Sequence, residues 1–136
     1  MKNILIAYLG STGGGVLDTY ELCESFTKYS ANTYSIILSE HNPYRDKYAS
    51  LPIKSISIVK THKRTSRDLL VQTLLFVRIL RIIRCILKSR PDLLLITMEH
   101  VWFVPVIFCM RLCKLNTIIV YIKHNPVTFD SVASRV

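Results

Sequence analysis

The chain has 136 residues, enough for one compact domain with a hydrophobic core. Half of the residues are hydrophobic and 20% are charged, and this composition excludes an intrinsically disordered protein. The formal net charge of +9 favours acidic partners, such as phosphorylated substrates, anionic lipid headgroups or nucleic acid, without choosing among them.

The first half of the chain alternates short apolar segments with one helical segment. Asn3–Leu9 is a continuous apolar run, as expected of a strand that is buried on both faces of a parallel sheet. Val16–Lys28 then places apolar side chains along one side of a helix. Thr33–Ser39 is predicted to be a second strand and, after a polar loop over 40–52, Ile53–Lys60 a third and more exposed one.

The second half of the chain continues this alternation. A long helix is predicted from about Asp68 to Ser89, where it ends before a proline. Asp92–Thr97 is a fourth buried strand, Val101–Leu115 a helix and Asn116–Lys123 a fifth strand. Strands separated by helices predict a single Rossmann-like α/β domain with a mostly parallel, doubly wound sheet of about five strands and flanking helices.

We expect neither a membrane-spanning helix nor a zinc site, although the composition could suggest both. The apolar stretch Leu69–Leu87 contains three arginines, and each would cost about 2.5–3.5 kcal/mol at the centre of a bilayer. Val101–Met110 is too short to span one. The four cysteines lack the spacing of a zinc site, so we expect no metal and interpret them as small hydrophobic residues in a reducing compartment.

All four glycines of the chain lie in the turn between the first strand and the first helix, at Gly10, Gly13, Gly14 and Gly15. Glycine permits positive φ and lets a ligand approach the backbone, and the helix that follows offers unpaired N–H groups to a phosphate or a sugar hydroxyl. The spacing matches neither the dinucleotide fingerprint nor the P-loop. A ligand-binding loop and a tight turn are therefore equally good interpretations.

Further polar residues follow the fourth and fifth strands. Glu99 and His100 come directly after the fourth strand, and His124 and Asn125 come after the fifth. The carboxyl ends of parallel strands meet at one edge of the sheet, and ligands bind there where the strand order reverses. A lone histidine is more often a surface residue. Two of them at the same edge as a glycine loop favour a site.

Three segments, "KNILIAYLGSTGGGVLDTYELC", "RPDLLLITMEH" and "IIVYIKHNPVTFD", together resemble the N-terminal domain of GT-B glycosyltransferases, in particular the retaining group that uses nucleotide-sugar donors. The resemblance covers nearly the whole chain. It implies that the glycine loop faces the donor diphosphate and that the segment after the fourth strand lies near the transferred sugar or the acceptor. The candidate catalytic residues are His100 and Glu99, and the candidate residues for binding substrate or donor phosphate are Gly13, Gly14, Gly15, His124 and Asn125.

Members of that family continue into a second Rossmann-like domain, which binds most of the nucleotide sugar. We therefore expect the domain over residues 1–136 to be incomplete at its C-terminal end, and to need a donor-binding domain or a separate subunit. The resemblance implies a hexosyltransferase-type reaction with a nucleotide-diphosphate sugar as co-substrate and no covalently bound cofactor. The acceptor would be a cell-surface polysaccharide or a lipid-linked glycan. Half of a cleft cannot align donor and acceptor, so we expect the chain to be inactive alone, and whether it is an enzyme stays open.

Basic residues gather on one side of the long helix and in the loop before it, at Lys63, Arg64, Arg67, Arg78, Arg81, Arg84 and Lys88. The plain interpretation is a solvated polar face. The sharper one is a surface that docks on anionic membrane, worth about 1 kcal/mol per basic residue, or on an acidic protein partner. A non-catalytic α/β binding domain is therefore the second hypothesis for the function. In either case we expect a cytoplasmic protein, or one peripheral to the inner face of the cell membrane.

Two further partners fit the sequence less well. Nucleic acid is disfavoured because no DNA-binding or RNA-binding motif accompanies the positive charge. A small flavin or nucleotide binder is a weaker third hypothesis, since the glycine loop lacks the dense serine and threonine residues of a flavodoxin-like phosphate cradle.

Overall fold

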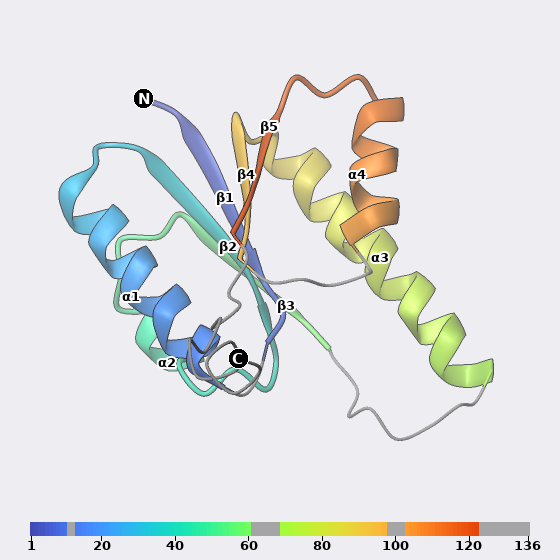
Figure 1. Ribbon diagram of the computed structural model, residues 1–136, viewed down its shortest axis with the longest axis horizontal. Helices are drawn as coiled ribbons and strands as arrows, with labels where there is room; N and C mark the ends of the chain where they lie inside the picture. Colours follow the sequence, from blue (N-terminus) through green and yellow to red (C-terminus); the bar gives the residue numbers. More distant parts are fainter. Residues whose placement is uncertain (11–12, 61–68, 98–102, 123–136) are drawn as a thin grey trace, which may run out of the picture.

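The structure is a computed structural model that describes residues 1–10, 13–60, 69–97 and 103–122 (Figure 1). In chain order its elements are β1 (Asn3–Tyr8), α1 (Gly14–Tyr29), β2 (Thr33–Ser39), α2 (Arg45–Tyr48), β3 (Ser55–Val59), α3 (Leu69–Ser89), β4 (Leu93–Ile96), α4 (Phe103–Leu112) and β5 (Ile118–Tyr121). The strands form one sheet in the order β3-β2-β1-β4-β5, and every neighbouring pair is parallel. The predicted α/β fold with a five-stranded parallel sheet is confirmed.

The sheet separates two layers of helices, with α1 and α2 on one face and α3 and α4 on the other (Figure 1). Because successive side chains of a strand point to opposite faces, β1 contributes Ile4 and Ile6 to the first layer and Leu5 and Ala7 to the second. All four side chains are buried. Burial on both faces is the physical reason for the continuous apolar runs in the sequence.

The short helix α2 was not predicted, because its residues lie in the polar loop between the second and third strands. It is a single helical turn, and so short an element carries no hydrophobic period. Its place is fixed by Tyr48, which is fully buried. The ring of Tyr20 on α1 stacks on Tyr44 at 5.3 Å between centroids and meets Tyr48 edge-on at 5.2 Å.

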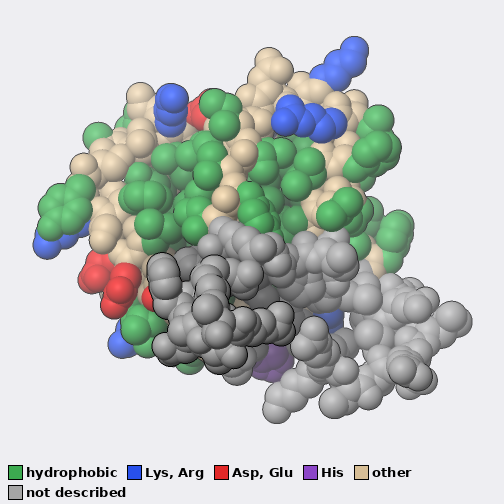
Figure 2. Space-filling view, viewed as in Figure 1, with side chains coloured by type: hydrophobic (Ala, Val, Ile, Leu, Met, Phe, Trp, Pro, Cys, Tyr) green, Lys and Arg blue, Asp and Glu red, His purple; other side chains and the backbone are tan. Residues whose placement is uncertain are grey.

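The side of the molecule that carries β5 and α4 has an apolar surface (Figure 2). Ile118, Val120 and Tyr121 of β5 are exposed, and so are Val104 and Phe108 of α4. Strands of a parallel sheet are normally covered on both faces.

In the part of the chain that the structure describes, no helix is both long enough and apolar enough to cross a membrane.

Candidate functional site

The carboxyl ends of β1, β4 and β5 lie side by side at one edge of the sheet. Ala7, Ile96 and Tyr121 are paired across the three strands, so these strands end at the same level. The backbone N–H of Ile122 donates to the carbonyl of Ile96 at 2.8 Å, which keeps the pairing to the end of β5. Since β1 lies between β2 and β4, the strand order reverses at this point, where ligands bind in open α/β sheets.

Helix α1 is tied to the end of β4 by two buried threonines. The hydroxyl of Thr19 donates to the carbonyl of Gly15 at 2.7 Å. It lies 3.3 Å from the hydroxyl of Thr97, which can donate to it in turn. Both threonine side chains are fully buried. This contact holds the glycine turn next to the point at which the chain leaves β4.

The glycine turn places an open stretch of backbone at the start of α1. Gly13 has a φ of 89°, a left-handed conformation that glycine adopts without strain, and no side chain caps the helix there. A Cβ atom on Gly14 would meet no heavy atom of the described residues within 4 Å. Among the described residues, nothing crowds a Cβ at the first turn of α1, whose leading N–H groups are of the kind that bind a phosphate or a hydroxyl group.

The other two glycines are explained by the packing of Tyr8 at the end of β1. A Cβ on Gly10 would collide with the Tyr8 hydroxyl, and one on Gly15 would lie 3.3 Å from it. Tyr8 is 3% exposed, and burial, helped by the carboxylate of Asp18, raises its pKa. The ligand-loop interpretation therefore rests first on Gly13 and Gly14, since the phenol ring already accounts for Gly10 and lies close to Gly15.

An acidic and basic cluster at the end of β2 was missed in the sequence. The Glu40 carboxylate lies 3.4 Å from the imidazole of His41. Arg78 of α3 is 5% exposed; burial lowers its pKa, and the nearby Glu40 carboxylate opposes that shift. The one signal in the sequence was the position of Arg78, a basic residue at the boundary of the apolar stripe of α3. That position could have indicated that Arg78 lies near an acidic residue such as Glu40.

Arg78 corrects the prediction of a single exposed basic face. Arg81, Arg84 and Lys88 are exposed, whereas Arg78 is buried. A spacing of three residues falls about 60° short of a full helical turn, so a row of residues with that spacing winds around the helix. The basic surface of α3 therefore begins at Arg81.

The remaining predicted site residues belong to segments outside the described part of the chain. Glu99 and His100 lie outside the described residues, as do His124 and Asn125 and the loop cations Lys63, Arg64 and Arg67. The structure does place Thr97 and Ile122, the last described residues before the two polar segments, at the same edge of the sheet as the glycine turn. Their roles stay predictions.

No protein-family model and no curated protein matches the chain. Among solved structures, the C-terminal domain of PF1911 hydrogenase from Pyrococcus furiosus superposes with a TM-score of 0.60 at 13% identity, over 90% of this chain and 92% of that one. UDP-GlcNAc 2-epimerase from Neisseria meningitidis, bound to UDP-GlcNAc, gives 0.59 at 14% identity, over 96% of this chain and 34% of the epimerase. A glycosyl transferase of family 9 from Veillonella parvula gives 0.55 at 14% identity, over 91% and 36%.

These identities show a shared fold and nothing finer. The chain spans about a third of the epimerase and of the family 9 glycosyl transferase, whereas it matches nearly all of the hydrogenase domain. The fold therefore resembles one domain of glycosyltransferases, and the same fold also occurs as a domain of another kind of protein.

Proposed function

We propose that the chain is the acceptor-side half of a glycosyltransferase that transfers a hexose from a nucleotide sugar to a cell-surface polysaccharide or a lipid-linked glycan. The observation that supports this best is the open glycine turn next to the ends of β4 and β5, at the edge where such sheets bind ligands. The similarity in fold to a glycosyl transferase and to an epimerase bound to UDP-GlcNAc agrees with it.

In this proposal the backbone at Gly13, Gly14 and Gly15 approaches the diphosphate of the donor. His124 and Asn125, after β5, supply N–H donors to the same phosphate or to a sugar hydroxyl. His100 and Glu99, after β4, act beside the transferred sugar, where an imidazole can donate to a sugar oxygen and a carboxylate can accept from a hydroxyl.

The second wall of the cleft belongs to a donor-binding domain, either in the same polypeptide or in a separate subunit. The exposed apolar side chains of β5 and α4 offer a surface against which further elements can pack. Transfer requires donor and acceptor to be aligned in a closed cleft, so the described half has no transferase activity alone.

The first experiment is to read the DNA downstream of the codon for Val136 and the neighbouring genes for a second Rossmann-like domain. That domain and this chain are then combined, and transfer of radiolabelled sugar from UDP-GlcNAc and other nucleotide sugars to a membrane lipid extract is measured. We expect transfer that needs both components. If no second domain is encoded, or if the combination transfers no sugar, the proposal is wrong.

Gly14→Val tests the glycine turn itself. The new side chain enters open space, so we expect the fold to survive while transfer falls about a hundredfold or more, because the donor phosphate loses its approach to the backbone. Ser25→Val, at an exposed position of the same helix, is the matched control and should retain transfer. Equal activity of the two variants would exclude the turn from the site.

A second candidate function is a non-catalytic domain that docks on an anionic membrane. It is favoured by α3, on which the exposed apolar residues Phe76, Val77 and Leu80 lie next to exposed cations. Flotation with anionic and neutral vesicles separates the candidates. Docking alone predicts salt-sensitive binding that Gly14→Val leaves intact and that Phe76→Ser with Leu80→Ser removes.

A further inference from the structure

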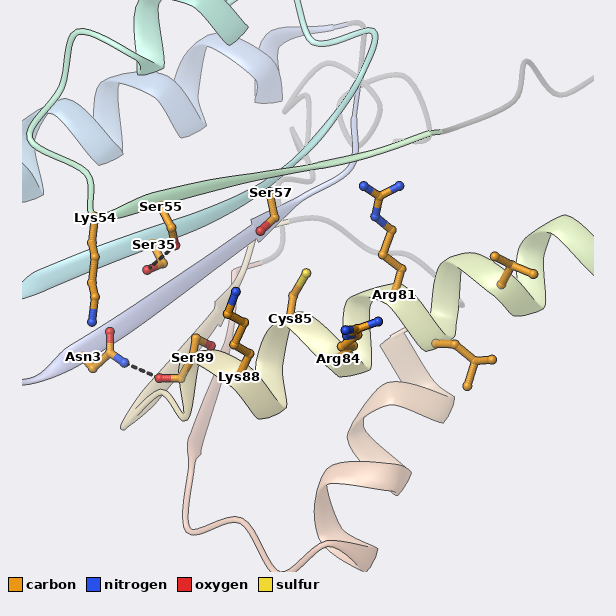
Figure 3. A pocket seen from close by; sticks show the side chains of 12 residues that line it. Asn3, Ser35, Lys54, Ser55, Ser57, Arg81, Arg84, Cys85, Lys88 and Ser89 are labelled. Carbon is orange, nitrogen blue, oxygen red and sulfur yellow. Dashed lines mark hydrogen bonds between the residues drawn. The ribbon is translucent and has the colours of Figure 1, made fainter.

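A cleft of about 900 Å³ lies between α3 and the sheet, away from the glycine turn. Its strand residues include Asn3, Ser35 and Ser55, at or near the amino ends of β1, β2 and β3, so it opens at the opposite end of the sheet from the candidate site (Figure 3). The volume is typical of pockets that bind small molecules.

The floor of the cleft is polar where the same face of the sheet is elsewhere apolar. Ser55, Ser35, Leu5 and Leu94 are paired across β3, β2, β1 and β4 at one level. The hydroxyl of Ser55 donates to that of Ser35 at 3.0 Å, which leaves the Ser35 hydroxyl able to donate into the cleft. Ser57 continues this polar row on β3.

Both walls of the cleft carry cations. Arg81, Arg84 and Lys88 come from α3, and Lys54 comes from the opposite side, just before β3 (Figure 3). The described lining contains no Asp or Glu. Like charges that line one cleft repel one another, and a bound anion relieves that repulsion.

Asn3 adds a buried acceptor to this lining. Its side-chain N–H donates to the carbonyl of Ser89 at 2.6 Å, while the neighbouring carboxylate of Asp92 accepts from the backbone N–H of Asn3 at 2.7 Å. The Oδ1 atom of Asn3 is buried and makes no hydrogen bond to any described residue. A buried acceptor of this kind is satisfied by water or by a hydroxyl group of a ligand.

We propose that this cleft binds a phosphate ester that also carries hydroxyl groups, either a soluble polyol phosphate or the glycerol-phosphate headgroup of an anionic lipid. The cations neutralise the phosphate, the hydroxyls of Ser35 and Ser57 donate to its oxygens, and Asn3 Oδ1 accepts from a ligand hydroxyl. The inference is independent of the proposed transfer reaction, because the two sites lie at opposite ends of the sheet.

Glycerol 3-phosphate is the soluble probe. Titrated to about 10 mM into the full ¹⁵N-labelled chain, it is expected to give saturable amide shifts at Ser35, Ser55 and Cys85. Arg84→Gln with Lys88→Gln should weaken binding about tenfold or more. Lys28→Gln with Arg45→Gln removes the same charge from exposed positions in the α1 and α2 layer, outside the cleft, and should leave binding unchanged.

Ser35→Ala distinguishes specific binding in the cleft from general attraction to a positively charged surface, because the substitution removes a hydroxyl and changes no charge. We expect it to weaken binding about threefold to tenfold, the effect of one lost hydrogen bond. Lys54→Gln, on the other wall, should lower the affinity even if the double variant of α3 fails to fold. Equal losses in the cleft variant and in the matched control would overturn the proposal.

Vesicles of phosphatidylglycerol in phosphatidylcholine identify the source of the phosphate. Saturable binding of the soluble ester assigns the cleft to a polyol phosphate. Binding to these vesicles alone, lost in the cleft variants and kept in the control, assigns it to a lipid headgroup, with Val77 and Leu80 at the cleft positioned to meet acyl chains. Absence of saturable, variant-sensitive binding to both probes would overturn the proposal.

Discussion

Two flanks of one sheet face, both beside α3, are built from different side chains. Over β1 and β4 the sheet presents Leu5 and Leu94, which pack in one buried cluster with Ile86 of α3. At the same level β2 and β3 present Ser35 and Ser55, which line a cleft with the cations of α3. The apolar flank fixes the helix to the sheet. The serine flank is therefore free to serve binding, and its substitution should cost the fold little.

The largest expected effect is on the apolar flank. Leu94 is fully buried, so Leu94→Ala removes apolar contacts, leaves a cavity and should lower the free energy of unfolding by about 2–5 kcal/mol. Urea denaturation followed by circular dichroism measures it. Ser57→Ala, on the serine flank, is the control and should change stability by less than about 0.5 kcal/mol. Similar decreases in the free energy of unfolding in both variants would mean that the two flanks contribute equally to stability.

The same division is expected among the glycines. Gly10→Ala brings a Cβ against the buried Tyr8 hydroxyl and should cost about 1–3 kcal/mol, because the ring cannot move without disturbing the core. Gly14→Ala enters open space in the first turn of α1 and should be neutral or stabilise by up to about 1 kcal/mol. Thermal unfolding of the two variants is the measurement. A reversed order would mean that Gly14, not Gly10, is required by the fold.

The sequence predicted those parts of the fold that depend on local pattern. Continuous apolar runs identified buried strands, and the alternation around Ser55 and Ser57 identified a strand with one polar face, because both patterns follow from the two-residue period of a strand. The order of the strands is not a local property. For that reason neither the pairing of Ser35 with Ser55 nor the cleft above it was predicted.

The candidate site was only partly predictable for a related reason. The glycines were recognised as a turn, but their separate causes depend on where the Tyr8 ring packs, which no spacing reveals. The burial of Arg78 beside Glu40 depends on which side of α3 meets the sheet. By contrast, the position of the glycine turn beside the ends of β4 and β5 followed directly from parallel topology.

The layer on the other face of the sheet gives a pH-dependent test. Burial raises the pKa of Cys23 from 9.0 to about 12, although the neighbouring hydroxyl of Tyr48 opposes the shift. The folded state holds the thiol proton more tightly, so this stabilisation is complete below pH 9 and is lost as the pH rises toward 12. By pH 10 the loss is about 1 kcal/mol.

Urea unfolding at pH 8 and pH 10 measures this loss for the wild type and for Cys23→Ala, which should lose less between the two pH values. Cys113→Ala removes an exposed thiol and should keep the wild-type dependence. If Cys23→Ala lost as much unfolding free energy between pH 8 and pH 10 as the wild type, ionisation of the Cys23 thiol on unfolding would not be the cause of the loss.

The smallest effect is expected where an apolar residue is introduced into the serine flank. Ser57→Val carries the apolar pattern of the rest of the face into β3, and valine favours strands, so stability should stay the same or rise by up to about 1 kcal/mol. The same change should weaken binding of glycerol 3-phosphate, because it replaces a hydroxyl in the cleft by two methyl groups. If Ser57→Val raises stability and weakens binding, the serine flank is polar because it binds a ligand and not because the fold needs it. A variant that loses both would instead make the serines part of the folding core.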